Sequence, residues 1–296
     1  MLYLDKYGYT PDEGKIEAGI KSIADNLNQL SSPEVLKQCF SIMDLTTLKT
    51  TDTVESVSKL VDKVNKLPEA FPGYPAPASI CVFPNFASTV RSLKNDPEVH
   101  VTTVSSCFPT AQSFLEVKVR ECELAVRGGA DEIDIVLALN AFLAGDEERA
   151  YEEIVTMKNA IEKAAAAEDR HVVLKVILET GLLVTPANIA EASFLAMEAG
   201  ADFIKTSTGK VDVNATPTSA YVMCEAIRRY YELSGRKVGF KAAGGISTAA
   251  DAICYYYIVS NILGRDWLCK ERFRFGVSRL GNSLISAIEQ KTVNFF

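Results

Sequence analysis

The sequence predicts a (β/α)8 barrel, also called a TIM barrel, with a helical extension at its N-terminus. Eight short apolar runs alternate with longer amphipathic stretches, which is typical of a parallel α/β fold. The runs are apolar almost throughout, as expected for strands that are covered on both faces. An open doubly wound sheet could share this alternation, but no Gly-x-Gly-x-x-Gly motif follows an early run. The sequence therefore favours the closed barrel.

The N-terminal extension is expected to occupy residues 1–40. Pro11-Asp12-Glu13 resembles the start of a helix. Apolar side chains then recur at helical spacing, at Ile16, Ile20, Ile23 and Leu27. We expect an accessory helical segment within a single domain that spans residues 1–296.

The barrel itself is expected to occupy residues 41–280, followed by a C-terminal helix and tail over 281–296. A chain of 296 residues, 48% of them hydrophobic, is long enough for one barrel of about 250 residues with extensions. Its strands are predicted at 42–45, 79–83, 101–105, 132–137, 172–178, 203–206, 238–241 and 273–277.

The net charge limits the partners that the protein can have. The formal charge is −7 at pH 7, and the isoelectric point is near 5.1. Such a surface repels nucleic acid and anionic membranes, so neither is an expected partner. If the protein binds a phosphate, it must therefore do so in a local, preorganised pocket.

The cysteines and histidines indicate a reducing compartment and no histidine-rich metal site. The seven cysteines are odd in number, scattered and free of Cys-x-x-Cys pairs, which favours a cytoplasmic protein over a disulfide framework. His100 and His171 are the only histidines, although a magnesium site built from carboxylates alone stays open. We find no apolar signal segment and no run long enough to span a membrane.

Two short segments of the sequence match each other, and each includes the start of a predicted strand. Residues 129–134, Gly-Ala-Asp-Glu-Ile-Asp, match residues 200–205, Gly-Ala-Asp-Phe-Ile-Lys. In both, a helix is expected to end at the glycine and a strand to begin at once. This match places Asp134 and Lys205 at the same depth in strands four and six. Because alternate strands of a barrel share a layer of inward side chains, these two should point into one layer.

Five ionisable residues lie inside the apolar runs. A buried charge costs several kcal/mol unless another charge compensates it, and lysine and aspartate are rarely buried unpaired. Each residue alone could be a strand end that reaches solvent. All five together favour convergence inside the barrel. They are Asp44, Asp134, Lys175, Lys205 and Lys241.

Convergent lysines have a specific chemical use. Only the free amine of lysine is a nucleophile, and a second cation in a dry pocket lowers the pKa of a lysine toward neutrality. Lys205 and Lys241 could form such a pair, with Asp134 balancing the charge and moving protons. The amine would attack a carbonyl to give an imine, which accepts electrons during C–C cleavage. Such chemistry needs no metal and no added cofactor.

Three glycine-containing turns predict a phosphate site. They follow strands six, seven and eight, at 206–210, 243–246 and 275–278. Glycine lets backbone N–H groups approach an anion closely, and the next helix adds its dipole. Barrels commonly bind phosphate in the loops after strands seven and eight.

Two long motifs resemble the deoxyribose-phosphate aldolase family. Phe-Ile-Lys-Thr-Ser-Thr-Gly-Lys at 203–210 is similar to the family's Schiff-base motif, and Val-Gly-Phe-Lys-Ala-Ala-Gly-Gly at 238–245 to its second-lysine motif. The resemblance runs from about Asp44 to Ser278. Shorter matches lie at 43–48, 81–84, 132–136 and 174–180.

The resemblance implies a metal-independent class I aldolase, an aldehyde-lyase of nucleoside and carbohydrate catabolism. Such an enzyme reversibly cleaves 2-deoxy-D-ribose 5-phosphate to D-glyceraldehyde 3-phosphate and acetaldehyde. Carried over by motif, Lys205 would form the Schiff base, Lys241 would depress its pKa, and Asp134 would orient Lys241 and a proton-shuttling water. The implied ligands are sugar phosphates and aldehydes, and a homodimer is left open.

The resemblance also assigns the residues around the substrate. Those expected to hold the phosphate are Gly209, Lys210, Gly244, Gly245, Gly276 and Ser278. Those expected to line the site are Asp44, Thr208 and Lys175.

The sequence departs from the family at four places. Ala242 replaces a common proline, 138–140 is an unusual stretch, and Arg279 replaces a small hydroxyl residue of some members. The chain ends in Phe295-Phe296, without the terminal tyrosine that reaches the site in some members.

Two other functions stay open on the residues alone. One is another lysine-dependent sugar-phosphate barrel enzyme, such as a transaldolase-like or pyridoxal-phosphate enzyme. The other is a non-catalytic sugar-phosphate-binding barrel. The intact set of Lys205, Lys241 and Asp134 argues against the second, because binding alone would not need a strained lysine pair.

Overall fold

The computed structural model describes residues 1–296 and contains a closed barrel of eight parallel strands. The strands follow one another around the barrel in chain order, and β8 closes it by pairing with β1. The predicted (β/α)8 fold is therefore confirmed. The strands are β1 (Met43–Thr46), β2 (Ser79–Val82), β3 (His100–Val104), β4 (Glu132–Val136), β5 (Val173–Ile177), β6 (Phe203–Lys205), β7 (Gly239–Ala243) and β8 (Phe273–Val277).

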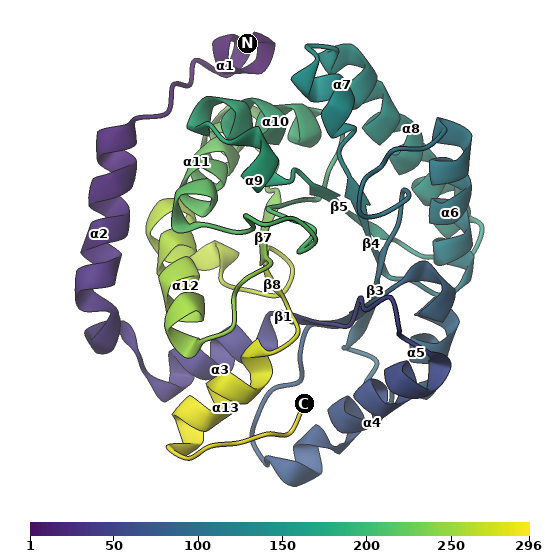
Figure 1. The fold of residues 1–296 in the computed structure, drawn as a ribbon, viewed down its shortest axis with the longest axis vertical. Coiled ribbons are helices and arrows are strands. Elements are labelled where there is room, and N and C mark those ends of the chain that lie inside the picture. The colour runs from purple at the N-terminus through teal and green to yellow at the C-terminus, as the bar shows by residue number, and fades with distance from the viewer.

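A ring of helices surrounds the strands (Figure 1). Several begin at a threonine whose side chain accepts a hydrogen bond from the first turn, as Thr53, Thr216 and Thr248 do. After the strands come α4 (Val54–Ala70), α5 (Ala87–Leu93), α6 (Leu115–Arg127), α7 (Leu139–Leu143), α8 (Glu147–Ala166), α9 (Thr180–Leu183), α10 (Pro186–Glu198), α11 (Pro217–Ser234), α12 (Ala249–Leu263) and α13 (Leu280–Glu289), with short 3-10 turns at Pro84–Phe86 and Arg265–Trp267.

Three helices precede the barrel: α1 (Leu2–Tyr7), α2 (Glu13–Leu30) and α3 (Pro33–Ser41). Asp12 caps α2 by accepting a hydrogen bond from the backbone N–H of Lys15, at 3.0 Å. The three helices lie outside α10, α11, α12 and α13 (Figure 1). The ring of Tyr7 stacks on that of Phe194, with 4.4 Å between the centroids. The extension therefore adds a second layer of helices to one side of the barrel.

The register of the strands brings the ionisable residues together. Lys205 pairs with Lys241 between β6 and β7, and Asp134 pairs with Lys175 between β4 and β5. Gly129 and Gly200 have φ angles of +93° and +100°, so each turns its chain from a helix into the following strand. Asp134 and Lys205 are then each the third residue of their strand.

Three segments connect or follow the regular elements. The Pro-rich segment 67–78 begins inside α4, which accommodates Pro68 in its last turn. The unusual stretch at 138–140 caps and starts the short helix α7. The C-terminal tail folds back on α13, where Asn282 Oδ1 accepts hydrogen bonds from the backbone N–H groups of Phe295 and Phe296, at 2.8 and 2.9 Å. None of the helices combines the length and apolarity needed to cross a membrane.

Candidate active site

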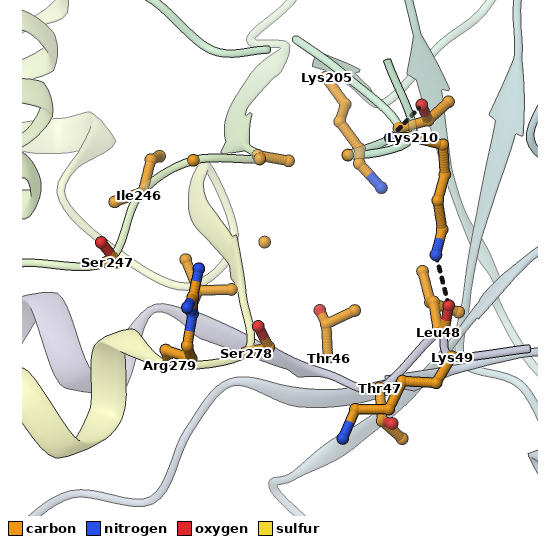
Figure 2. A pocket seen from close by; sticks show the side chains of 17 residues that line it. Thr46, Thr47, Leu48, Lys49, Lys205, Lys210, Ile246, Ser247, Ser278 and Arg279 are labelled. Carbon is orange, nitrogen blue, oxygen red and sulfur yellow. Dashed lines mark hydrogen bonds between the residues drawn. The ribbon is translucent and has the colours of Figure 1, made fainter. Parts of the chain in front are cut away.

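A pocket of about 290 Å³ lies at the carboxyl ends of β1, β6, β7 and β8. Lys205 enters it from β6, while Ser278 and Arg279 lie across from it at the end of β8 (Figure 2). Of the five ionisable strand residues singled out in the sequence, only Lys205 lines the pocket. Its side chain therefore connects the cavity to the charged interior of the barrel.

Asp134 holds two lysines beneath the pocket. Lys205 Nζ donates a hydrogen bond to Asp134 Oδ2 at 2.8 Å, and Lys241 Nζ donates to the same oxygen at 2.7 Å. Lys241 also forms an ion pair with Asp44. All four residues are buried, Lys205 at 3% exposure and the others at 0%. Water therefore screens these charges little.

The environment shifts the pKa values of the two lysines in opposite directions. Burial lowers the pKa of Lys205, and the neighbouring Lys241 lowers it further, while Asp134 acts in the opposite direction. Burial also disfavours the charge of Lys241, but the carboxylates of Asp134 and Asp44 outweigh it and raise its pKa above the ordinary lysine value. Lys205 is thus the lysine disposed to become a free amine, whereas Lys241 keeps its proton.

Asp134 remains ionised in this setting. Burial alone would raise its pKa, but Lys175, Lys205 and Lys241 outweigh burial and hold the pKa well below the usual range. Lys175 Nζ donates to the second oxygen, Oδ1, at 3.0 Å. One carboxylate therefore binds three lysines.

Asp44 and Lys175 lie deeper than expected. Both are fully buried and neither lines the pocket. They reach the pocket through Lys241 and Asp134, respectively. Their place is in the charge network that supports Lys205.

Sequence reasoning missed Glu132 and Arg274 in this network. Arg274 Nη2 donates to Glu132 Oε1 at 2.6 Å, and Arg274 Nη1 contacts Asp44 Oδ1 at 2.5 Å. Glu132 also pairs with Lys175. The sequence does contain an indication of their role. Both are charged residues inside apolar strands, in Glu-Ile-Asp and in Phe-Arg-Phe.

The other end of the pocket is built from the glycine-containing turns after β6 and β7 and from the end of β8, which includes Gly276 of the predicted third turn. Gly209, Gly244 and Gly245 line it with φ angles of +80° to +83°, a region that glycine adopts without strain. Gly276 and Ser278 line it as well, and α13 begins two residues after Ser278. Backbone N–H groups and a helix N-terminus thus border one cavity, which suits an anion.

Thr208 and Lys210 are held in place by neighbours. Glu179, a third residue that sequence reasoning missed, accepts hydrogen bonds from Thr208 N at 3.1 Å and Thr208 Oγ1 at 2.5 Å. Lys210 Nζ donates to the backbone oxygen of Leu48 at 2.6 Å, across the edge of the pocket (Figure 2). Glu179 could be suspected only because it follows an apolar strand directly.

Comparison with known proteins agrees with this geometry. The family model described as DeoC/LacD family aldolase matches residues 39–255. The chain belongs to this aldolase family. A Caenorhabditis elegans protein named "Putative deoxyribose-phosphate aldolase" is 39% identical over 272 residues, which cover 91% of this chain and 86% of that protein.

Solved structures show the same fold. The aldolase QR15 is 26% identical, with a TM-score of 0.65 over 85% of this chain and 96% of its own. The deoxyribose-phosphate aldolase of Aeropyrum pernix, a tetramer, is 24% identical, with a TM-score of 0.67 over 94% and 98% of the two chains. As a member of the family, the protein is an aldolase and hence a lyase.

The family departures can now be placed in this aldolase. Arg279 lines the pocket and has no ion-pair partner within the chain. Ala242 is buried in β7, away from the pocket, and no residue of the tail lines the pocket. No group of three or more His, Cys, Asp or Glu side chains is arranged to hold a metal ion.

Proposed function

We propose that this aldolase reversibly cleaves 2-deoxy-D-ribose 5-phosphate to D-glyceraldehyde 3-phosphate and acetaldehyde through a Schiff base on Lys205. The observation that carries the proposal is the position of Lys205. It is the one interior charge that reaches the pocket, and its Nζ lies 2.8 Å from Asp134 Oδ2 beside Lys241. A buried amine with a depressed pKa is what carbonyl attack requires.

The reaction follows from the two lysines and the carboxylate. The free amine of Lys205 adds to the C1 aldehyde of the open-chain sugar, and the carbinolamine loses water to give an iminium ion. Electrons of the C2–C3 bond then move to the iminium nitrogen, while the C3 hydroxyl gives up its proton and becomes the aldehyde of glyceraldehyde 3-phosphate. The remaining enamine takes a proton at C2, and water releases acetaldehyde and Lys205.

Asp134 and Lys241 supply the proton transfers in this proposal. Both hydrogen bond within the same cluster as Lys205, so a proton can pass between them without leaving the dry interior. Lys241 remains an ammonium group because of its raised pKa, and Asp134 remains ionised, so a proton-bearing group and a carboxylate stand in contact beside Lys205.

The turns at the far side of the pocket would hold the phosphate. Gly209, Gly244, Gly245, Gly276 and Ser278 line that side, together with exposed cations. The exposed cations are Lys49, Lys210 and Arg279. Thr208 lines the pocket next to this turn. Such a site explains how a protein of charge −7 can bind an anion.

The experiment is a turnover assay with 2-deoxy-D-ribose 5-phosphate in the presence of EDTA. We expect both aldehyde products in equal amounts, no absorbance from bound pyridoxal phosphate, and no turnover by Lys205→Met. A matched control is Lys237→Met, at a half-buried lysine on the approach to β7 that does not line the pocket. Activity that EDTA abolishes would support a metal aldolase instead, and binding without turnover would support a sugar-phosphate-binding barrel.

The proposal also includes the cofactor requirement, the oligomeric state and the cellular location. Aldolases of this family are class I enzymes, so we propose that the protein needs no metal and no added cofactor. A homodimer and a cytoplasmic location remain predictions. All seven cysteines are free.

A further inference from the structure

Arg274 is buried in the part of the charge network that does not border the pocket. It is the second residue of β8, is 2% exposed and does not line the pocket. Its guanidinium group contacts Glu132 at 2.6 and 3.1 Å and Asp44 at 2.5 Å. It therefore touches no group that would react with a substrate.

Two short paths nevertheless join Arg274 to the reacting amine. Asp44 links it to Lys241, and Glu132 links it to Lys175. Both lysines then bind Asp134, the acceptor of Lys205. A change of charge at Arg274 is thus separated from Lys205 only by buried, hydrogen-bonded ions, where electrostatic interactions are strong.

The charges of this network balance only in one state of Lys205. Asp44, Glu132 and Asp134 provide three negative charges. Three positive charges come from Lys175, Lys241 and Arg274. With these groups ionised, the interior is neutral when Lys205 is an uncharged amine, and it gains a positive charge when Lys205 takes a proton. Without Arg274, the same carboxylates would need Lys205 as their third cation.

We propose that Arg274 is a positioning residue that keeps Lys205 as a free amine, by neutralising the carboxylates of Asp44 and Glu132 from below. The inference rests on the proposed role of Lys205 as the reacting amine. On this view Lys241 is not the only residue that keeps Lys205 uncharged. Arg274, which does not line the pocket, contributes as well.

Other titratable groups lie next to the network or at the mouth of the pocket. Cys81 on β2 is fully buried and burial raises the pKa of its thiol, so it stays uncharged. His100 on β3 contacts Glu132 through Nδ1 at 2.6 Å, and its side chain is 37% exposed. The cations at the mouth of the pocket, Lys49, Lys210 and Arg279, are exposed and therefore screened.

The test is the pH at which Lys205 becomes reactive, measured without any aldolase assay. Acetic anhydride acetylates only free amines, so the acetylation rate of Lys205 from pH 5 to 10 can be followed by mass spectrometry after digestion at residues other than lysine. We expect Arg274→Gln to raise the midpoint by about one pH unit or more, because one buried negative charge is left unbalanced. Glu132→Gln should lower it, and the double variant should return it to the wild-type value.

Two controls separate charge from structure. Arg274→Lys keeps the charge and should keep the midpoint near that of the wild type. Arg272→Gln removes a half-buried arginine two residues away, whose Nη1 donates to the Asp266 backbone oxygen and which has no contact with the network, and should leave the midpoint unchanged. Circular dichroism shows which variants fold; if Arg274→Gln does not, Glu132→Gln and the double variant decide.

The proposal is overturned if folded Arg274→Gln has an unchanged or lower midpoint. It is equally overturned if Glu132→Gln raises the midpoint, or if the double variant fails to return it to the wild-type value. Because acetylation needs no substrate, these results are independent of the proposed cleavage. A protein that shows the expected midpoints but no turnover would refute the aldolase reaction and leave the role of Arg274 standing.

Discussion

Lys205 and Lys241 donate hydrogen bonds to the same oxygen atom, Oδ2 of Asp134, at 2.8 and 2.7 Å. Two ammonium groups this close in a buried site repel each other, and only the carboxylate between them offsets that repulsion. Lys241 has a second carboxylate, that of Asp44, whereas Lys205 has none and borders the pocket. The proton is therefore more easily lost from Lys205.

Replacing Lys241 with leucine should abolish turnover at neutral pH. The variant loses the cation that opposes the protonation of Lys205, so Lys205 stays an ammonium group. A rise of two pKa units would lower the fraction of free amine, and hence the rate, by about 100-fold. The measurement is kcat/KM at pH 7, with Lys237→Leu, at a lysine outside the pocket, as the control. Near-normal activity of the folded Lys241→Leu variant would remove Lys241 from the mechanism.

The activity should have an acid limb set by Lys205. Only the free amine reacts, so kcat/KM should rise as the pH increases through the pKa of Lys205, which burial and Lys241 place below the ordinary lysine value. Lys241, with its raised pKa, keeps its proton throughout and causes no loss of activity on the alkaline side of neutrality. A pH profile of the cleavage reaction tests this. An acid limb at or above the pKa of a lysine in water would contradict the assigned environment.

Arg279 should contribute to the binding of phosphorylated substrates. It lines the pocket beside Ser278, and its side chain extends toward the cavity (Figure 2). Because a charge-assisted hydrogen bond contributes about 1.5–3 kcal/mol, and exposure reduces it, Arg279→Ser should raise KM for the sugar phosphate by roughly tenfold. Lys210 and Ser278 variants should act in the same direction. KM for an unphosphorylated substrate should change little; an equal change for both would place Arg279 outside the phosphate site.

Gly276→Ala should disturb catalysis through Lys241. A Cβ at this position would lie 2.8 Å from the Cβ of Ala243 and 3.0 Å from the Cε of Lys241, so something must shift. Overpacking costs about 1–3 kcal/mol of stability, and here it also displaces the lysine from Asp134. We expect a lower Tm together with a lower kcat.

A control variant for Gly276→Ala is available outside the barrel. Gly19→Ala would place a Cβ 2.5 Å from the ring of Tyr221, so it is overpacked as well, but it is remote from the pocket. It should lower Tm and leave the kcat of the folded enzyme intact. If both variants retain normal kcat, the contact between position 276 and Lys241 does not matter for the reaction.

The fold and the upper part of the site could be predicted from the sequence because they depend on local patterns. Apolar runs that alternate with amphipathic stretches define the strands, and the repeated Gly-Ala-Asp places Asp134 and Lys205 at equal depth. Glycine in three consecutive turns indicates where backbone can approach an anion. None of these signals requires knowledge of which residues meet across the barrel.

The lower part of the network could not be predicted in the same way. Glu132 and Arg274 are 142 positions apart and meet only when the barrel closes. Each stands close enough to a strand end to reach solvent, so the sequence alone does not show that they are buried. For the same reason Asp44 and Lys175 were expected at the pocket, whereas both lie beneath it. Lys210 donates a hydrogen bond to a backbone oxygen, and such a contact cannot be predicted from side-chain types.

The most direct test of the central claim is chemical trapping of the imine. The protein is incubated with acetaldehyde, sodium borohydride is added, and the modified peptide is identified by mass spectrometry, with a sample lacking borohydride and the Lys205→Met variant as controls. We predict one reduced adduct, an ethyl group on Lys205, that is absent from both controls. An adduct that forms on another lysine, or no adduct at all, would contradict the assignment of Lys205 as the reacting amine.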